Sequence, residues 1–198
     1  MAATSEKGLT ISGKAVHGVF GEPPISRWLF ADTRSGWIWL VLRVWLGWKW
    51  LEAGLHKVGN PVWTGPQAGG AVTGFLKGAL AKTTGEHPDV PGWYAWFIER
   101  VALPNAKLFS YLVAYGEVLV GIALIVGVLT GVAAFFGSLM NVAFLFAGTV
   151  STNPAMFIVA TWLVLAWRVA GWYGLDRWVL PALGTPWRPG AAFDRSNR

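Results

Sequence analysis

The chain contains no cysteine and only three histidines among its 198 residues. Without thiols it has no means of disulfide exchange or thiolate catalysis, and it cannot hold a cysteine-ligated iron–sulfur cluster or a zinc–thiolate site. A haem held between membrane helices usually needs two histidines, and of His17, His56 and His87 only His56 lies in a long apolar segment. We therefore expect no haem and no iron–sulfur cluster in this chain.

Charged residues are also scarce, at 13% of the chain, whereas hydrophobic residues make up 54% and 14 residues are tryptophan. Between Asn105 and Val150 only Lys107 and Glu117 carry a formal charge. This composition predicts an integral membrane protein. The net charge of +6 is spread over loops and termini without a dense basic block. We therefore expect contacts with membrane lipid and no binding of nucleic acid.

The long apolar segments predict an all-α fold, a bundle of four transmembrane helices. A helix of about 20 residues crosses the roughly 30 Å of hydrocarbon in a bilayer. Gly59 and Pro61 end the first segment, and a turn at Leu129–Gly131 makes the second and third an antiparallel hairpin. The predicted spans are about 35–58, 107–129, 131–150 and 155–173, within a polar N-terminal segment 1–34, a membrane domain 35–181 and a polar tail 182–198.

The connection between the first two spans is unusually long. Residues 61–104 contain two short apolar pieces, 70–81 and 93–103, which predict short helices at the external membrane surface. Residues 1–34 lack the pattern of a cleavable signal peptide, so we expect the first span to act as the targeting signal. Lysine and arginine favour the termini over the connection, which predicts cytoplasmic termini. The terminal set is Lys7, Lys14, Arg27, Arg34, Arg177, Arg188, Arg195 and Arg198.

The first span has two polar faces. Helical spacing places Lys49, Glu52 and His56 on one face. Glu52 and His56 stand one turn apart, a spacing that allows a carboxylate and an imidazole to hold and pass a proton. Alternatively, the three side chains only neutralise one another near the outer interface. One histidine with one or two carboxylates is too few for a metal site. The opposite face carries Arg43, Gly47, Trp50, Gly54 and Lys57.

Glu117 stands alone in the apolar second span. A carboxylate in the middle of a membrane is costly, so it usually faces the bundle interior with a partner and marks a functional site. One interpretation is a proton relay or a hydrogen-bond partner for a polar ligand. The other is a structural ion pair with Arg43 or Arg168, and Arg43 is the first candidate partner. Arg168 is equally compatible with a position at the lipid headgroups.

Three segments of the chain resemble the DoxX/DoxD family of small four-helix membrane proteins. They are RVWLGWKWLEAGLHKVGNP (43–61), GEVLVGIALIVGVLTG (116–131) and GWYGLDRWVLP (171–181). The resemblance implies a multi-pass protein of a prokaryotic plasma membrane, similar to the membrane subunit of a thiosulfate:quinone oxidoreductase. Arg43, Glu52, Lys57 and Glu117 match polar positions of the family. The long connection resembles the DoxD-like branch.

These observations lead to two hypotheses of different kinds. The first is a quinone-interacting membrane subunit of an oxidoreductase, with Glu117, Glu52 and His56 as catalytic residues and Arg43, Lys57 and Arg168 as residues that bind the quinone. The second is a non-catalytic accessory or assembly subunit of a larger membrane complex of the respiratory type. Both imply other protein subunits as partners. A small-solute transporter is less favoured, because the sequence has no inverted repeat.

Overall fold

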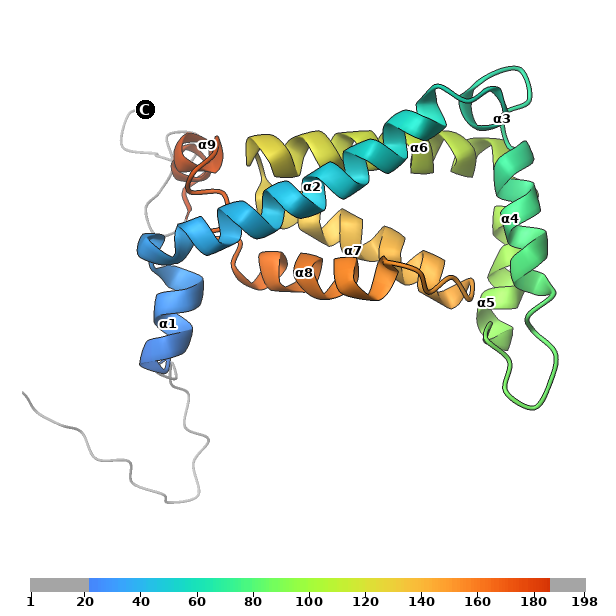
Figure 1. Cartoon of the computed structure of the whole chain (residues 1–198), viewed down its shortest axis with the longest axis horizontal. Helices are drawn as coiled ribbons and strands as arrows, with labels where there is room; N and C mark the ends of the chain where they lie inside the picture. Colours follow the sequence, from blue (N-terminus) through green and yellow to red (C-terminus); the bar gives the residue numbers. More distant parts are fainter. Residues whose placement is uncertain (1–21, 186–198) are drawn as a thin grey trace, which may run out of the picture.

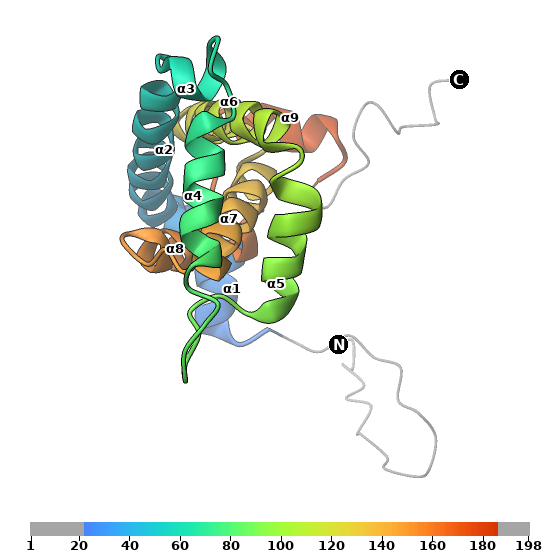
Figure 2. The same cartoon turned by 90° about the vertical axis from the view of Figure 1, so that its right-hand side faces the viewer.

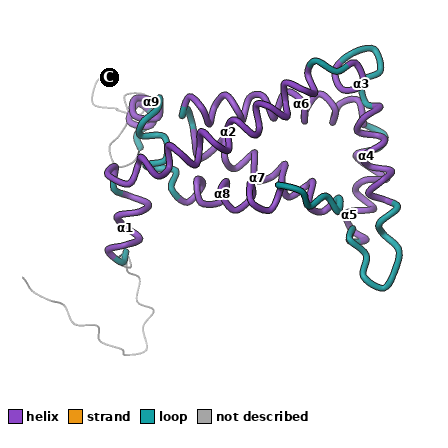
Figure 3. The backbone as a smooth tube through the Cα atoms, viewed as in Figure 1, coloured by secondary structure: helices purple, strands orange, loops and turns teal. Residues whose placement is uncertain are grey.

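The computed structural model describes residues 22–185, and within them the chain is all-α, with nine α-helices and no strand. The all-α prediction is confirmed. The four longest helices run alongside one another as a bundle, and Figure 3 shows how loops and short helices join them (Figure 1). The bundle helices are α2 (Gly36–Val58), α6 (Ala106–Val126), α7 (Thr130–Phe146) and α8 (Asn153–Leu165).

Glycines let α2 and α6 approach until their backbones touch. A Cβ atom on Gly47 would lie 2.9 Å from the carbonyl oxygen of Gly121, and one on Gly54 would lie 2.7 Å from the backbone nitrogen of Val118. Neither distance is possible for a real side chain, so both positions require glycine. Small residues at helix contacts are the usual basis of packing in lipid, where no hydrophobic effect drives helices together. The α2–α6 contact is therefore the rigid centre of the bundle.

Short helices cross both ends of the bundle (Figures 1 and 2). At one end lies α1, and at the other lie α4 and α5, in the segments where short apolar helices were predicted. A second hydrophobic core forms beneath α4 and α5, around Val72, Leu76 and Ile98. The bounds are α1 (Pro24–Ala31), α3 (Pro61–Thr64), α4 (Gly70–Leu80), α5 (Gly92–Phe97), a π-helical turn η2 (Ile98–Ala102) and α9 (Asp176–Ala182).

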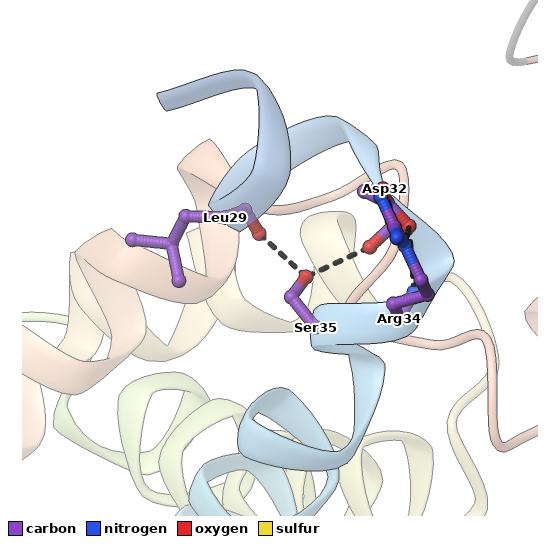
Figure 4. A network of polar contacts seen from close by, with 4 residues as sticks. All are labelled: Leu29, Asp32, Arg34 and Ser35. Carbon is purple, nitrogen blue, oxygen red and sulfur yellow. Dashed lines mark hydrogen bonds and ion pairs between the residues drawn. The ribbon is translucent and has the colours of Figure 1, made fainter. Parts of the chain in front are cut away.

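Specific hydrogen bonds hold these end helices in place. The Ser35 hydroxyl donates to the carbonyl oxygens of Leu29 and Asp32, both at 2.8 Å, and so fixes the corner between α1, the 3₁₀ turn η1 (Thr33–Ser35) and α2 (Figure 4). At the other end, Tyr94 on α5 donates to the carbonyl of Ala143 at 2.8 Å. Burial raises the pKa of Tyr94, which keeps the phenol in its donating form.

Only α6 among the described helices is both long and apolar enough to cross a bilayer by itself. α2 has 23 residues, but it carries Arg43, Lys49, Glu52 and Lys57. α7 and α8 are apolar and shorter, with 17 and 13 residues, against the roughly 20 that a full crossing needs. Each predicted span therefore contains a helix. Of these helices, α6 alone has both the length and the apolar composition of a membrane span.

Two predicted spans are longer than the helices observed. The third helix ends at Phe146, short of residue 150, and the fourth ends at Leu165, short of residue 173. After Leu165 the chain continues in turns, because residues there bond to α6 and to the turn after it. Leu175 donates its N–H to the carbonyl of Val126 at 3.3 Å, and Asp176 donates to that of Gly127 at 2.8 Å.

Some sequence predictions fall on residues 1–21 and 186–198, which lie outside the described residues. They include the position of His17 and the expectation that the chain lacks a cleavable signal peptide. They also include part of the charge count behind the predicted topology, namely Lys7, Lys14, Arg188, Arg195 and Arg198.

Candidate functional site

The two predicted faces of α2 have opposite surroundings. Arg43, Gly47, Trp50 and Gly54 are buried, whereas Lys49, Glu52 and His56 face outward. The helical-wheel prediction for this span is confirmed. The polar residues of α2 therefore form two sets, one that faces the bundle interior and one that faces the surroundings of the bundle. The candidate site residues must therefore be considered in two groups.

Glu117 lies inside the bundle, where only 1% of its surface is exposed. Its Oε2 accepts a 2.6 Å hydrogen bond from the Nζ atom of Lys57 on α2, which forms an ion pair. The ammonium group of Lys57 also lies 5.2 Å from the centre of the Trp63 ring. An interior position with a cationic or hydrogen-bonding partner from the first or fourth span was predicted and is confirmed, but Arg43, the first candidate, was the wrong partner. Arg43 precedes Lys57 by about four turns, or roughly 20 Å of helix.

Arg43 instead binds backbone carbonyls near the far end of α6. Its Nη1 donates to the carbonyls of Leu124 at 2.6 Å and Ile125 at 2.7 Å, and its Nη2 donates to that of Tyr173 at 2.9 Å. The carboxyl end of a helix is partially negative, so it stabilises a buried cation, and the nearby carboxylate of Asp176 adds a favourable charge interaction. Gly127 makes room for the guanidinium, since a Cβ there would lie 2.8 Å from Arg43 Cζ.

Asp176 completes this end of the bundle, and the sequence analysis did not single it out. Its carboxylate accepts hydrogen bonds from the N–H groups of Leu129 at 2.6 Å and Thr130 at 2.9 Å, at the start of α7. Only 2% of its surface is exposed. A carboxylate at a helix N-terminus satisfies donors that the helix itself leaves free. The sequence signal that could have identified Asp176 is its position in the GLDRW segment, directly after the tight Gly171–Gly174 turn.

Glu52 and His56 lie together on the outer face of α2. With Trp48, Leu51 and Leu55 they line an open groove of ≈ 290 Å³. Lys49 forms an exposed ion pair with Glu52, with its Nζ 3.5 Å from Oε2. The groove therefore offers apolar walls beside a carboxylate and an imidazole.

The structure does not bring the predicted catalytic residues into one site. Glu117, on α6, faces α2 inside the bundle, whereas Glu52 and His56 are exposed on the outer side of α2. Arg168, predicted to bind the quinone, lies elsewhere: its Nη1 is 3.7 Å from Oε1 of Glu22, and its guanidinium lies over the Trp167 ring at 5.7 Å.

Several buried polar side chains have atoms without a hydrogen-bond partner in the described part of the chain. Two of these side chains are Trp50, through its indole Nε1, and Asn141, through both amide atoms. A Cβ on Gly137 would lie 3.0 Å from that indole nitrogen, so α7 comes close to α2 here. Leaving such groups unpaired costs about 1–3 kcal/mol each. Around the Trp50 indole, the contact between α2 and α7 is therefore held by close packing.

The described residues contain no group of three histidine, aspartate or glutamate side chains that could hold a metal ion. Comparison with known proteins gives one positive result. No curated protein and no solved structure matches the chain. The DoxX family model matches residues 38–171, which cover all four bundle helices except the first two residues of α2, and the chain therefore belongs to the DoxX family of membrane proteins.

Proposed function

We propose that this protein is a quinone-interacting membrane subunit of an oxidoreductase, of the thiosulfate:quinone oxidoreductase type. The observation that carries this proposal is the groove on α2, in which Glu52 and His56 stand between Trp48, Leu51 and Leu55. A quinone head is flat and apolar with two carbonyl oxygens. Leucine and tryptophan walls suit its faces, and an imidazole N–H suits a carbonyl oxygen.

The chemistry required of the chain is proton transfer. Reducing a quinone by two electrons consumes two protons, which the bound quinone takes up at its oxygens. His56 would donate a hydrogen bond to one carbonyl oxygen, and Glu52, one helical turn earlier, would exchange protons with His56. Both side chains lie in the last two turns of α2 and are exposed on its outer face, so protons would reach them from the membrane surface at that end of the helix.

The remaining candidate residues have positioning roles in this proposal. Lys57 and Glu117 join α2 to α6 on the side opposite the groove, and they hold the groove-bearing helix in place. Arg43 is occupied by backbone carbonyls and fixes the same helix at its other end. Arg168 contacts Glu22 and Trp167, away from the groove.

Binding of a short-chain quinone analogue to the purified full-length protein in detergent micelles tests this proposal. We expect saturable binding that weakens about tenfold in His56→Ala and in Glu52→Gln, since one hydrogen bond of a charged group contributes about 1.5 kcal/mol or more. His87→Ala and Glu99→Gln, at exposed positions outside the groove, are matched controls and should bind normally. Wild-type protein that does not bind the analogue, or groove variants that bind like the controls, would refute the proposal.

A partner subunit is part of the same proposal, because Glu52 and His56 move protons and the electrons must come from another redox group. Blue-native electrophoresis of native membranes tests this point. We expect the chain to migrate within a larger complex. If the complex forms but the purified protein and the complex both fail to bind the analogue, the accessory or assembly role is the better description. A chain that migrates alone argues against both roles.

A further inference from the structure

A second groove lies on the other side of the bundle, where α7, α8 and α9 meet. It has a volume of ≈ 260 Å³, and no charged side chain lines it. Phe135 on α7 is 54% exposed, which shows that this face is open to its surroundings. In a membrane protein such a face is in contact with lipid. The lining residues are Leu129, Gly131, Val132, Phe135, Val164, Trp167 and Leu180.

A cation lies one helical turn from the groove residue Leu180. Arg177 lies three residues before Leu180 on α9, and this spacing places both side chains on the same side of the helix. The guanidinium lies over two indole rings, 5.4 Å from the centre of Trp172 and 5.9 Å from that of Trp178. Tryptophan and arginine together are typical of the headgroup level of a bilayer.

The charge of Arg177 is not neutralised by a carboxylate among the described residues, where the ion pairs involve other cations. The neighbouring carboxylate of Asp176 is buried and accepts from the backbone of Leu129 and Thr130. Arg168, beside the groove residue Trp167, is near Glu22. The edge of the apolar groove is therefore positively charged, and Arg177 remains available for an anion.

We propose that this groove binds an anionic phospholipid, with an acyl chain against Val132, Phe135 and Leu180 and the phosphate at Arg177. The fork of N–H donors on a guanidinium matches phosphate oxygens, which makes arginine the residue best suited to this contact. The apolar lining provides the matching surface for the chain. The site differs from the α2 groove in its helices and in its ligand, and it does not depend on the proposed function.

Native mass spectrometry of the full-length protein, titrated with dioleoyl phosphatidylglycerol or dioleoyl phosphatidylcholine, tests the proposal. We expect tighter binding of phosphatidylglycerol. Arg177→Gln should weaken it about fivefold, the factor that corresponds to about 1 kcal/mol per basic residue near a lipid surface, and should leave phosphatidylcholine binding unchanged. Arg100→Gln, an exposed arginine at the other end of the bundle, is the matched control and should change neither lipid.

The apolar part of the site is tested by filling it. Val132→Trp should weaken both lipids, and Leu180→Trp replaces it if that variant does not fold. Glycerol phosphate, which has the headgroup charge without acyl chains, should not compete at the same concentration. Equal affinity for the two lipids in wild-type protein would overturn the proposal. Equal losses in Arg177→Gln and Arg100→Gln, or competition by glycerol phosphate alone, would also overturn it.

Discussion

The bundle buries two charges from the same helix face and neutralises them in different ways. Lys57, toward the end of α2, meets the side chain of Glu117, whereas Arg43, near its start, meets backbone carbonyls of Leu124, Ile125 and Tyr173. The first solution needs one matching residue on another helix. The second needs a helix end, a chain turn and a glycine in the right places. Two cations that look equivalent in the sequence therefore depend on very different parts of the structure.

The largest effect is expected when one partner of the Lys57–Glu117 pair is removed. Lys57→Met leaves the Glu117 carboxylate buried without a counter-ion, at a cost of about 3–5 kcal/mol in the free energy of unfolding. Glu117→Gln should cost less, because the Lys57 side chain is 21% exposed and can turn toward its surroundings. Unfolding of the purified protein in mixed micelles, followed by circular dichroism, measures both values.

The double variant Lys57→Met with Glu117→Leu sharpens this test. Replacing a buried ion pair by apolar residues is often close to neutral, so we expect the double variant to lose much less stability than the sum of Lys57→Met and Glu117→Leu measured singly. Additive losses would show that the two side chains do not act as a pair. Glu117→Gln combined with Arg43→Gln should be additive, because Arg43 lies about four turns along α2 from Lys57, the partner of Glu117.

At the end of the bundle that holds Arg43, a substitution that leaves the arginine intact should still lower the stability of the protein. Gly127 has φ = 73°, and an added Cβ would lie 2.8 Å from Arg43 Cζ. Gly127→Ala combines left-handed strain with a steric clash and should cost about 2–4 kcal/mol. Gly78→Ala is the control: this glycine is inside α4 with nothing within 4 Å of an added Cβ, so we expect stabilisation by about 0.5–1 kcal/mol. Equal effects at the two positions would refute the role given to Gly127.

The smallest effect is expected at an exposed pair, which serves as a reference for the buried one. Hydrogen bonds from Arg34 lower the pKa of Asp32 below its ordinary value of 3.8. Because the folded pKa is lowered, the pair contributes to stability above the unfolded pKa, and this contribution is lost as the pH falls through the folded pKa. Asp32→Asn should therefore change the thermal midpoint slightly at neutral pH and not at all at strongly acidic pH. A constant difference across this pH range would contradict the interpretation.

The sequence predicts the parts of the structure that repeat with helical periodicity. The two faces of α2, the interior position of Glu117 and the short helices between α2 and α6 all follow from spacing and composition. The partner of Glu117 was mistaken because helical spacing gives the side of a residue, whereas the register between two helices decides which residues meet. That register depends on the contacts of Gly47, Gly54 and Gly121, whose spacing along their own helices does not fix it.

The Arg43 site was not predictable in the same way. Backbone carbonyls are present at every residue and leave no trace in composition, so nothing in the sequence shows that Leu124, Ile125 and Tyr173 are acceptors. Asp176 was missed for a similar reason. It is one acid in a polar segment, and its role at the start of α7 depends on the turn that ends α8 early. Helical spacing restricts the side chains that can become partners, whereas it gives no information about backbone acceptors.

The hydrogen bond from Arg43 to Tyr173 has a consequence for the synthesis and membrane insertion of the protein, because it joins residues 130 positions apart. At a synthesis rate of about 5–20 residues per second, the ribosome needs roughly ten seconds to proceed from one to the other. During that interval α2 leaves the ribosome, and Arg43 lacks its acceptor at Tyr173. We infer that the insertion machinery, or bound water and lipid, solvates this cation until Tyr173 has been made. The helix α2 is therefore made early but reaches its final contacts late.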